Sequence, residues 1–245
     1  MDFKYTAIII EPRKHKAIEF VLNNICECLS REWDIILFHG TTNTDYVTKI
    51  VESNTLFENR VKLVGLNVEN LDITEYSRLL ATKSVIYDYI QSDIFLVFQT
   101  DSMILPANKH IINEFLNYDY VGAPWLITNY SLTKNSSFIG NGGFSLRRKG
   151  KMLEIVEKIE WNRANEFKEC YYSNIYEDLY FCTNYDNIVV NKPEYRKALT
   201  FCVDEVFYEA PFGCHKPWTH RHYEQLVNLY PEIKTLRDLQ DVEKN

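Results

Sequence analysis

The stretch Ile94-Phe95-Leu96-Val97-Phe98-Gln99-Thr100-Asp101 decides the fold that we expect for this chain. Its five consecutive apolar residues predict a buried strand, and the polar residues after Phe98 mark where that strand ends. Such strands occur in parallel sheets with helices on both faces, where ligands bind beyond the carboxyl ends of the strands. Asp101 therefore stands at a position where a ligand is expected.

The residues before this strand alternate between strand and helix patterns. Strands are expected at 6–10, 33–38 and 61–68, and helices at 14–30, 45–52 and 74–90, with Thr74 as a possible cap. This alternation predicts an α/β fold with a Rossmann-type, mostly parallel central sheet that is flanked by helices.

The second half of the chain is less regular. It predicts a strand at 118–121, a strand-turn-strand unit at 138–146, helices at 149–159 and 177–183, a strand at 201–207 and a weakly helical tail from 231. The polar loop Thr128–Ser137 follows a strand and is a candidate mobile lid. Neither a repeat nor a linker interrupts the sequence, which predicts a single domain.

Composition excludes several classes of protein. The 245 residues carry a formal net charge of -7 and no basic run longer than Arg147-Arg148-Lys149, so a nucleic-acid partner is not expected. The start of the chain lacks an apolar signal region and no apolar run could cross a bilayer, which predicts a soluble, cytoplasmic protein. The six cysteines are expected to be reduced. Cys26-x-Cys28 could form half of a zinc site, but no second pair has matching spacing.

Two segments could together hold a metal diphosphate. Asp101 offers a hard oxygen ligand to Mg²⁺ or Mn²⁺, although an Asp after a strand is also a common turn former or helix cap. In His215-Lys216-Pro217-Trp218 the imidazole could bind the metal and the ammonium could meet phosphate oxygens. The alternative for this segment is a buried His with Trp218 in the core.

Other segments suggest binding or catalysis, each with a plain structural alternative. Gly142 and Gly143 permit the close approach of a ligand, but Asn-Gly is also the strongest hairpin signal. In Glu177-Asp178 a carboxylate could take the proton of an acceptor hydroxyl, or it could simply suit the start of a helix. Arg13 and Arg78 could pair with phosphate or cover a base, whereas most Arg residues form surface ion pairs. Trp125 could stack on a sugar or lie in the core.

The order of these segments resembles that of GT-A glycosyltransferases. Gln99-Thr100-Asp101 resembles a degenerate Asp-x-Asp motif in which Gln99 replaces the first Asp. Gly140–Leu146 is similar to the glycine-rich segment of fringe and β-1,3-galactosyltransferase-like enzymes. Glu177-Asp178 resembles their Glu-Asp motif, and Gly213–Trp218 resembles the terminal motif of glycogenin-like transferases, with His215 next to Lys216 instead of before the Gly.

A closer resemblance covers roughly residues 70 to 218. The segments Tyr76–Leu80, Phe98–Ser102, Tyr118–Trp125, the Asn-Gly-Gly segment and the His-Lys-Pro-Trp segment look like an uncharacterised, glycosyltransferase-like family of bacteria, fungi and giant viruses. If the chain is viral, the cytoplasmic location would mean the host cytoplasm or the virion.

These resemblances imply one GT-A-like domain over residues 1–245. About 1–102 would form the nucleotide-binding half, about 103–218 the acceptor half and 219–245 a helical tail. The implied activity is the metal-dependent, inverting transfer of a sugar from a nucleoside-diphosphate sugar, a UDP-sugar in the first place, to a hydroxyl of a glycan or other acceptor.

The resemblances also imply a role for each site residue. Asp101 and His215 would hold Mn²⁺ or Mg²⁺, and Asp178 would act as the base, with Glu177 in reserve. The remaining donor-binding residues would be Arg13, Arg78, Gln99, Gly142, Gly143 and Lys216, and the acceptor-binding residues Tyr120 and Trp125. The alternative is a non-catalytic sugar- or protein-binding module that retains the fold. A methyltransferase is disfavoured because Glu11-Pro12-Arg13 follows the first strand without a glycine.

Overall fold

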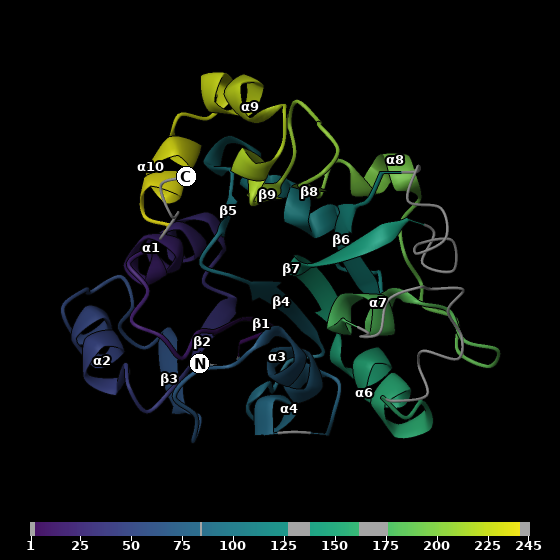
Figure 1. Cartoon of the computed structure of the whole chain (residues 1–245), viewed down its shortest axis with the longest axis horizontal. Helices are drawn as coiled ribbons and strands as arrows, with labels where there is room; N and C mark the ends of the chain where they lie inside the picture. The colour runs from purple at the N-terminus through teal and green to yellow at the C-terminus, as the bar shows by residue number, and fades with distance from the viewer. Residues whose placement is uncertain (1–2, 84, 127–137, 162–175, 241–245) are drawn as a thin grey trace.

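The computed structural model describes residues 3–83, 85–126, 138–161 and 176–240 (Figure 1). Its main feature is a six-stranded sheet with the strand order β3-β2-β1-β4-β7-β6. The strands are β1 (Tyr5–Ile10), β2 (Trp33–His39), β3 (Val61–Gly65), β4 (Ile94–Phe98), β6 (Tyr120–Pro124) and β7 (Ile139–Arg148). The first four are parallel, β7 is antiparallel to β4, and β6 is antiparallel to β7. The predicted α/β fold with a mostly parallel sheet is confirmed.

The strand sequences are apolar throughout because both faces of the sheet are covered. In β1, Ala7 and Ile9 point into one core cluster, while Ile8 and Ile10 point into the other. The first cluster contains α1 (Ile18–Cys28), α2 (Thr44–Glu52), α9 (Tyr223–Leu229) and α10 (Glu232–Asp238), and the second contains α3 (Ile73–Leu80), α4 (Val85–Tyr89), α6 (Lys149–Lys158) and α7 (Glu177–Cys182). A helical layer on each side therefore gives three layers.

A second, three-stranded sheet continues from the end of β4. It has the order β5-β9-β8 and consists of β5 (Ser102–Ile104), β9 (Gly213–His215) and β8 (Cys202–Val203). β5 is antiparallel to β9, with Ser102 opposite His215. The backbone N–H of Lys216 donates to the carbonyl of Asp101 at 3.0 Å, which extends this pairing by one residue. The register thus places Asp101 beside His215 and Lys216.

The helix predicted at 74–90 is wrong as a single element, because α3 ends at Leu80 and α4 begins at Val85. The Tyr87 hydroxyl donates to the Leu80 carbonyl at 2.8 Å, which satisfies an acceptor that a continuous helix would have used itself. The predicted cap, Thr74, is also wrong. Helix α3 is capped two residues earlier by Asp72, which forms a capping box with Glu75.

The strand-turn-strand unit predicted at 138–146 is wrong, since one continuous strand, β7, runs through the Asn-Gly-Gly segment. The pairing of β6 with β7 shifts register between Val121 and Ala123. At this point Gly122 lies so close to β7 that a Cβ on it would meet the Asn141 carbonyl oxygen at 2.3 Å. The irregularity is therefore a bulge between two strands and not a hairpin turn.

Several predicted elements are shorter than expected. Helix α1 begins at Ile18 instead of 14, β3 ends at Gly65, and β8 retains only Cys202–Val203 of the expected 201–207. The remaining elements are the 3₁₀ helices η1 (Pro106–Glu114) and η4 (Pro217–Thr219) and the short helix α8 (Tyr195–Ala198). The candidate lid Thr128–Ser137 lies outside the described residues.

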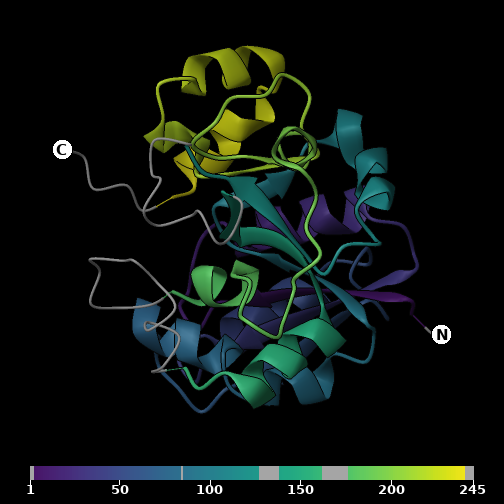
Figure 2. The same ribbon diagram turned by 90° about the vertical axis from the view of Figure 1, so that its right-hand side faces the viewer.

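Helices α9 and α10 pack at the opposite end of the molecule from α6 (Figure 2). Beyond α10, the Gln240 amide donates to the Thr100 carbonyl at 2.8 Å, so the end of the described chain contacts the residue next to Asp101. Among the described residues, no helix combines the length and the apolar character that crossing a membrane requires.

Candidate functional site

A cleft opens at the carboxyl ends of β1 and β4, where the parallel sheet is expected to bind ligands. It has two adjoining pockets that share Ile73, Tyr76, Gln99 and Lys216. The first pocket encloses about 260 Å³ and is further lined by Ile10, Glu11, Pro12, Arg13, Asn70, Leu71, Asp72, Thr100 and Asp101. The second encloses about 210 Å³ and is further lined by Ser77, Asn141, Gly142, Gly143, Tyr176, Glu177, Asp178 and His215. Most residues predicted for the site therefore meet in one cleft.

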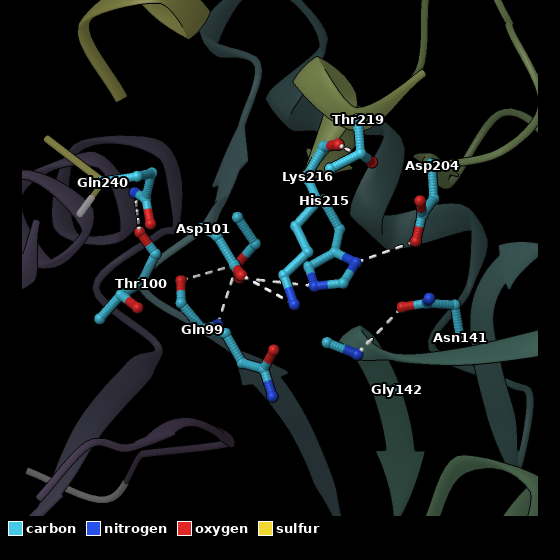
Figure 3. A network of polar contacts seen from close by, with 12 residues as sticks. Gln99, Thr100, Asp101, Asn141, Gly142, Asp204, His215, Lys216, Thr219 and Gln240 are labelled. Carbon is cyan, nitrogen blue, oxygen red and sulfur yellow. Dashed lines mark hydrogen bonds and ion pairs between the residues drawn. The ribbon is translucent and has the colours of Figure 1, made fainter. Parts of the chain in front are cut away.

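Asp101, His215 and Lys216 form the centre of this cleft (Figure 3). Lys216 Nζ lies 3.1 Å from Asp101 Oδ2, and His215 Nε2 lies 3.4 Å from Asp101 Oδ1. Burial alone would raise the pKa of Asp101, but the charges of His215 and Lys216 hold that pKa well below its usual range. Lys216 has a left-handed backbone, with φ of 44°, which is uncommon for a residue other than glycine and typical of functional sites.

Asp204, which sequence reasoning missed, supports His215 from the side opposite Asp101 (Figure 3). Its Oδ2 lies 2.9 Å from His215 Nδ1, and its Oδ1 lies 2.8 Å from His220 Nε2. Burial favours the neutral form of His215, yet Asp101 and Asp204 together raise its pKa to about 9. Burial also opposes the charge of Asp204, but its two His partners lower its pKa to about 2. The sequence held a signal for Asp204, because it follows the apolar run Phe201–Val203 as Asp101 follows Phe98.

The side-chain atoms with which Asp101 and His215 face each other are of the kind that bind a divalent cation. Asp101 Oδ1 and His215 Nε2 are buried, face each other and make no hydrogen bond within the described residues. The Asp204 contact at Nδ1 is the support that metal-binding His residues usually have at their second nitrogen. A proton on Nε2 and a cation would compete for this position. The described residues contain no group of three or more His, Cys, Asp or Glu that could hold a metal, so this part of the chain offers a cation no more than the pair Asp101 and His215 here.

Gly142 and Gly143 of β7 make room for side chains of the protein itself, while their role as an approach for the donor sugar stays a prediction. A Cβ on Gly143 would lie 2.2 Å from His215 Nε2. A Cβ on Gly142 would lie 2.3 Å from Glu177 Oε1. Both glycines line the second pocket, but their absent side chains are what allows His215 and Glu177 to reach their places.

Replacing Gly143 with Ala is expected to lower the free energy of unfolding by about 1–3 kcal/mol, the usual cost of overpacking. The added methyl group would displace the buried His215 ring from its contacts with Asp101 and Asp204. Gly150→Ala is the matched control, because the nearest atom to its new Cβ is 3.6 Å away and Ala suits helix α6 better than Gly. Urea unfolding should show opposite signs for the two variants, and an unchanged stability of Gly143→Ala would contradict this packing.

Glu177 is held in a buried ion pair with Arg147. Arg147 is fully buried, and its Nη1 lies 2.6 Å from Glu177 Oε2 while its Nη2 lies 3.1 Å from Oε1. The guanidinium also lies over the Tyr120 ring at 5.2 Å. Tyr120 is itself fully buried and its hydroxyl donates to the Gly140 carbonyl at 2.7 Å, so its predicted contact with an acceptor is wrong. It supports β7 from within the core.

The other predicted residues are distributed as follows. Arg13 lines the first pocket, where Glu11 accepts two hydrogen bonds at 2.8 Å from its guanidinium. Gln99 lines both pockets and Asp178 lines the second. Trp125 is partly buried and lies against Gly140, outside the cleft lining. Arg78 is exposed and lines neither pocket, because helix α3 turns its neighbours Tyr76 and Ser77 towards the cleft instead.

The cysteines in the described part of the chain line neither pocket of the cleft. Cys26, Cys28, Cys182, Cys202 and Cys214 are buried, and Cys170 lies outside the described residues. Burial raises the pKa of both Cys26 and Cys28 to about 11. These two thiols are therefore poor metal ligands, which need a thiolate.

The sheet order and the cleft define a fold shared with glycosyltransferases of the GT-A class. The galactosyltransferase LgtC, solved in complex with donor and acceptor sugar analogues, matches with a TM-score of 0.58 at 11% identity, covering 98% of each chain. The glycosyltransferase GlyE from Streptococcus pneumoniae TIGR4 matches with a TM-score of 0.56 at 13% identity, covering 99% of this chain and 61% of GlyE. The bifunctional glycosyltransferase WbbM matches with a TM-score of 0.58 at 12% identity, covering 98% of this chain and 52% of WbbM.

The chain thus spans only about half to three fifths of GlyE and WbbM. At these identities the similarity shows the fold. The chain belongs to the family described as "Protein of unknown function (DUF5672)", whose model matches residues 60–215. This range contains Asp101, the glycines of β7, Glu177-Asp178 and His215. A search of the curated proteins finds no match.

Proposed function

We propose that the chain transfers a sugar from a nucleoside-diphosphate sugar, with a UDP-sugar as the first candidate, to a hydroxyl group of an acceptor. The observation that carries this proposal is the pair of buried, facing atoms Asp101 Oδ1 and His215 Nε2, with the Lys216 ammonium beside them. They lie at the carboxyl end of β4, in the cleft of a fold shared with glycosyltransferases.

The centre of the cleft suits the diphosphate of the donor, and the first pocket suits its base. Asp101 and His215 would hold Mn²⁺ or Mg²⁺, which supplies Lewis-acid stabilisation of the charge on a departing diphosphate. The Lys216 side chain is about half exposed and lines both pockets, so its ammonium can reach phosphate oxygens at their junction. Arg13 lines the first pocket, and two hydrogen bonds to Glu11 hold its guanidinium there. In this position the guanidinium can cover the base or contact phosphate.

Asp178 is better suited than Glu177 to take the proton of the acceptor hydroxyl. Both oxygens of Glu177 are held by Arg147, whereas Asp178 is only partly buried and lines the second pocket together with His215 and Lys216. A base that faces the leaving group across one pocket favours inversion at the anomeric carbon. Trp125 remains a candidate for contact with the acceptor.

The first experiment is the binding of UDP with and without Mn²⁺, measured by calorimetry on the full chain. The proposal expects affinity that depends on the metal, and it fails if no nucleoside diphosphate binds in a metal-dependent way. Slow hydrolysis of UDP-sugars would separate an enzyme from the alternative, a non-catalytic binding module, which the replacement of the first motif Asp by Gln99 leaves open.

Asp178→Asn is expected to slow sugar transfer about 100-fold or more, the usual worth of a general base. Its affinity for UDP and Mn²⁺ should change little, because the metal ligands and Lys216 are unaltered. The measurement is UDP release from a panel of UDP-sugars. Asp88→Asn, on the exposed face of α4, is the control. A transfer rate equal to that of the wild type would remove Asp178 as the base.

Asp204→Asn is expected to weaken Mn²⁺ binding about 10- to 100-fold, the usual effect of removing the partner of a metal-binding His. The side chain of Asn is uncharged, so it would hold the His215 ring less firmly. It would also no longer favour the form of His215 in which Nδ1 carries a proton and donates it to residue 204. Free Mn²⁺ can be measured by electron paramagnetic resonance without any turnover. The control is Glu205→Gln, which changes the neighbouring carboxylate, and equal losses in both variants would contradict a specific role for Asp204.

A further inference from the structure

A third pocket lies beside the site but shares no lining residue with the cleft. It encloses about 410 Å³, more than either pocket of the cleft, and this volume is typical of small-molecule sites. Its lining consists of Leu126, Glu205, Val206, Phe207, Arg221, His222 and Gln225. These residues come from the segment just after β6, the loop after β8, and the first turn of α9 with the two residues before it.

One wall of this third pocket is apolar and exposed. Phe207 is 37% exposed and Leu126 is 44% exposed, which places both among the few large apolar side chains on the described surface. The Phe207 ring also packs on His222, with 5.9 Å between ring centroids. An exposed aromatic face that is held in place suits the apolar C–H face of a sugar ring.

The remaining lining is polar, and the side chains of Arg221, His222 and Gln225 have hydrogen-bonding capacity that no described residue uses. The side chains of Arg221 and Gln225 make no hydrogen bond or ion pair with any residue in the described part of the chain. His222 is 5% exposed, and its buried Nε2 has no partner among the described residues. Glu205 accepts a hydrogen bond from the Leu126 backbone at 3.0 Å, which joins the two sides of the pocket. Planar polar groups around an apolar wall can bond to the hydroxyls at the rim of a sugar.

The position of the third pocket connects it to the site. Glu205 directly follows Asp204, whose carboxylate holds His215, and Leu126 directly follows Trp125, the candidate acceptor contact. We propose that this pocket binds a saccharide unit of the acceptor at a distance from the reacting hydroxyl. The acceptor is then an oligosaccharide or glycoconjugate, and the pocket contributes to its selection. This inference rests on the proposed function for its role, although saccharide binding can be tested separately.

The test uses saturation-transfer NMR on the full chain with four disaccharides: lactose, maltose, cellobiose and diacetylchitobiose. Wild type should bind at least one of them, and Phe207→Ala and Arg221→Ala should each weaken that binding about tenfold, because they remove the stacking face or the charged donor. Val189→Ala, at an apolar side chain that is 72% exposed elsewhere, should have no effect. UDP binding with Mn²⁺ is measured on the same samples and should be unchanged in all three variants.

The outcomes separate this inference from the proposed function. If disaccharide binding persists in both pocket variants, or if wild type binds UDP but none of the disaccharides, the third pocket is not a saccharide site. If wild type binds a disaccharide through Phe207 and Arg221 but binds no nucleotide, the pocket stands and the transferase proposal fails. That last result would identify a saccharide-binding module.

Discussion

Replacing Glu177 with Gln is expected to lower the free energy of unfolding by about 3–5 kcal/mol, as breaking a buried ion pair usually does. Arg147 is fully buried, and Glu177 is its counter-charge, at 2.6 Å. The amide of Gln would preserve the volume of the side chain but leave the guanidinium charge in the core without compensation. Urea unfolding followed by tryptophan fluorescence measures the loss, and a loss below about 1 kcal/mol would contradict this account.

Two control variants separate the buried pair from simpler effects. Glu157→Gln breaks the exposed pair with Lys83 at 3.5 Å and should cost less than about 0.5 kcal/mol. Replacing both partners, as Arg147→Met with Glu177→Leu, should recover much of the stability, because no isolated charge is left behind. A double variant as unstable as Glu177→Gln would show that the hydrogen bonds of Arg147 to Ser145 and Gly142 matter more than the pair itself.

Asp101→Ala is expected to weaken the binding of UDP in the presence of Mn²⁺ by about 1,000-fold. Removing only the outer partner of a metal ligand commonly costs 10- to 100-fold, and Asp101 would be a direct ligand. It is also the ion-pair partner of Lys216, at 3.1 Å. Calorimetry at a fixed Mn²⁺ concentration measures the change, with Asp45→Ala on the exposed side of α2 as the control.

The same variant gives a second, opposite expectation when the metal is absent. Without Mn²⁺, Asp101 is a negative charge in the cleft, and it repels a diphosphate and occupies the Lys216 ammonium. Asp101→Ala should then bind UDP as well as wild type or better. Metal-dependent binding that survives in Asp101→Ala would exclude Asp101 as a ligand, whatever its effect on catalysis.

Three strands of the central sheet, β1, β2 and β4, could be predicted almost to the residue, whereas β3 and β6 end elsewhere than expected. Strand β4 runs over Ile94–Phe98 as expected, and β1 and β2 each differ from the prediction by one residue. They are apolar runs bounded by polar residues, so the local sequence is enough to define them. The helix at 74–90 and the turn at 138–146 failed because contacts distant in sequence, from Tyr87 to Leu80 and from Gly122 to Asn141, determine these segments.

The sequence indicates which residues are candidates for the site, but it does not indicate which of them contact one another. Asp101 and His215 were identifiable because both stand near strand ends, yet the antiparallel pairing of β5 with β9 that joins them is too short to leave a pattern. No local pattern indicates that Gly142 and Gly143 make room for Glu177 and His215, because these two residues are distant in sequence. Tyr120 and Arg147 carry no local sign of being fully buried.

The register of β5 with β9 also has a consequence for how the protein is made. Asp101 and Lys216 are more than a hundred positions apart in the chain, and their junction closes only when two short strands meet. Closing so long a loop costs entropy that few local contacts offset, so this junction is expected to form late in folding. A ribosome-bound chain that ends before Gly213 would contain β1 to β4 but would lack His215 and Lys216. A nascent chain is therefore expected to bind neither the proposed cation nor the proposed donor before residues 213–216 have been made and have paired with β5.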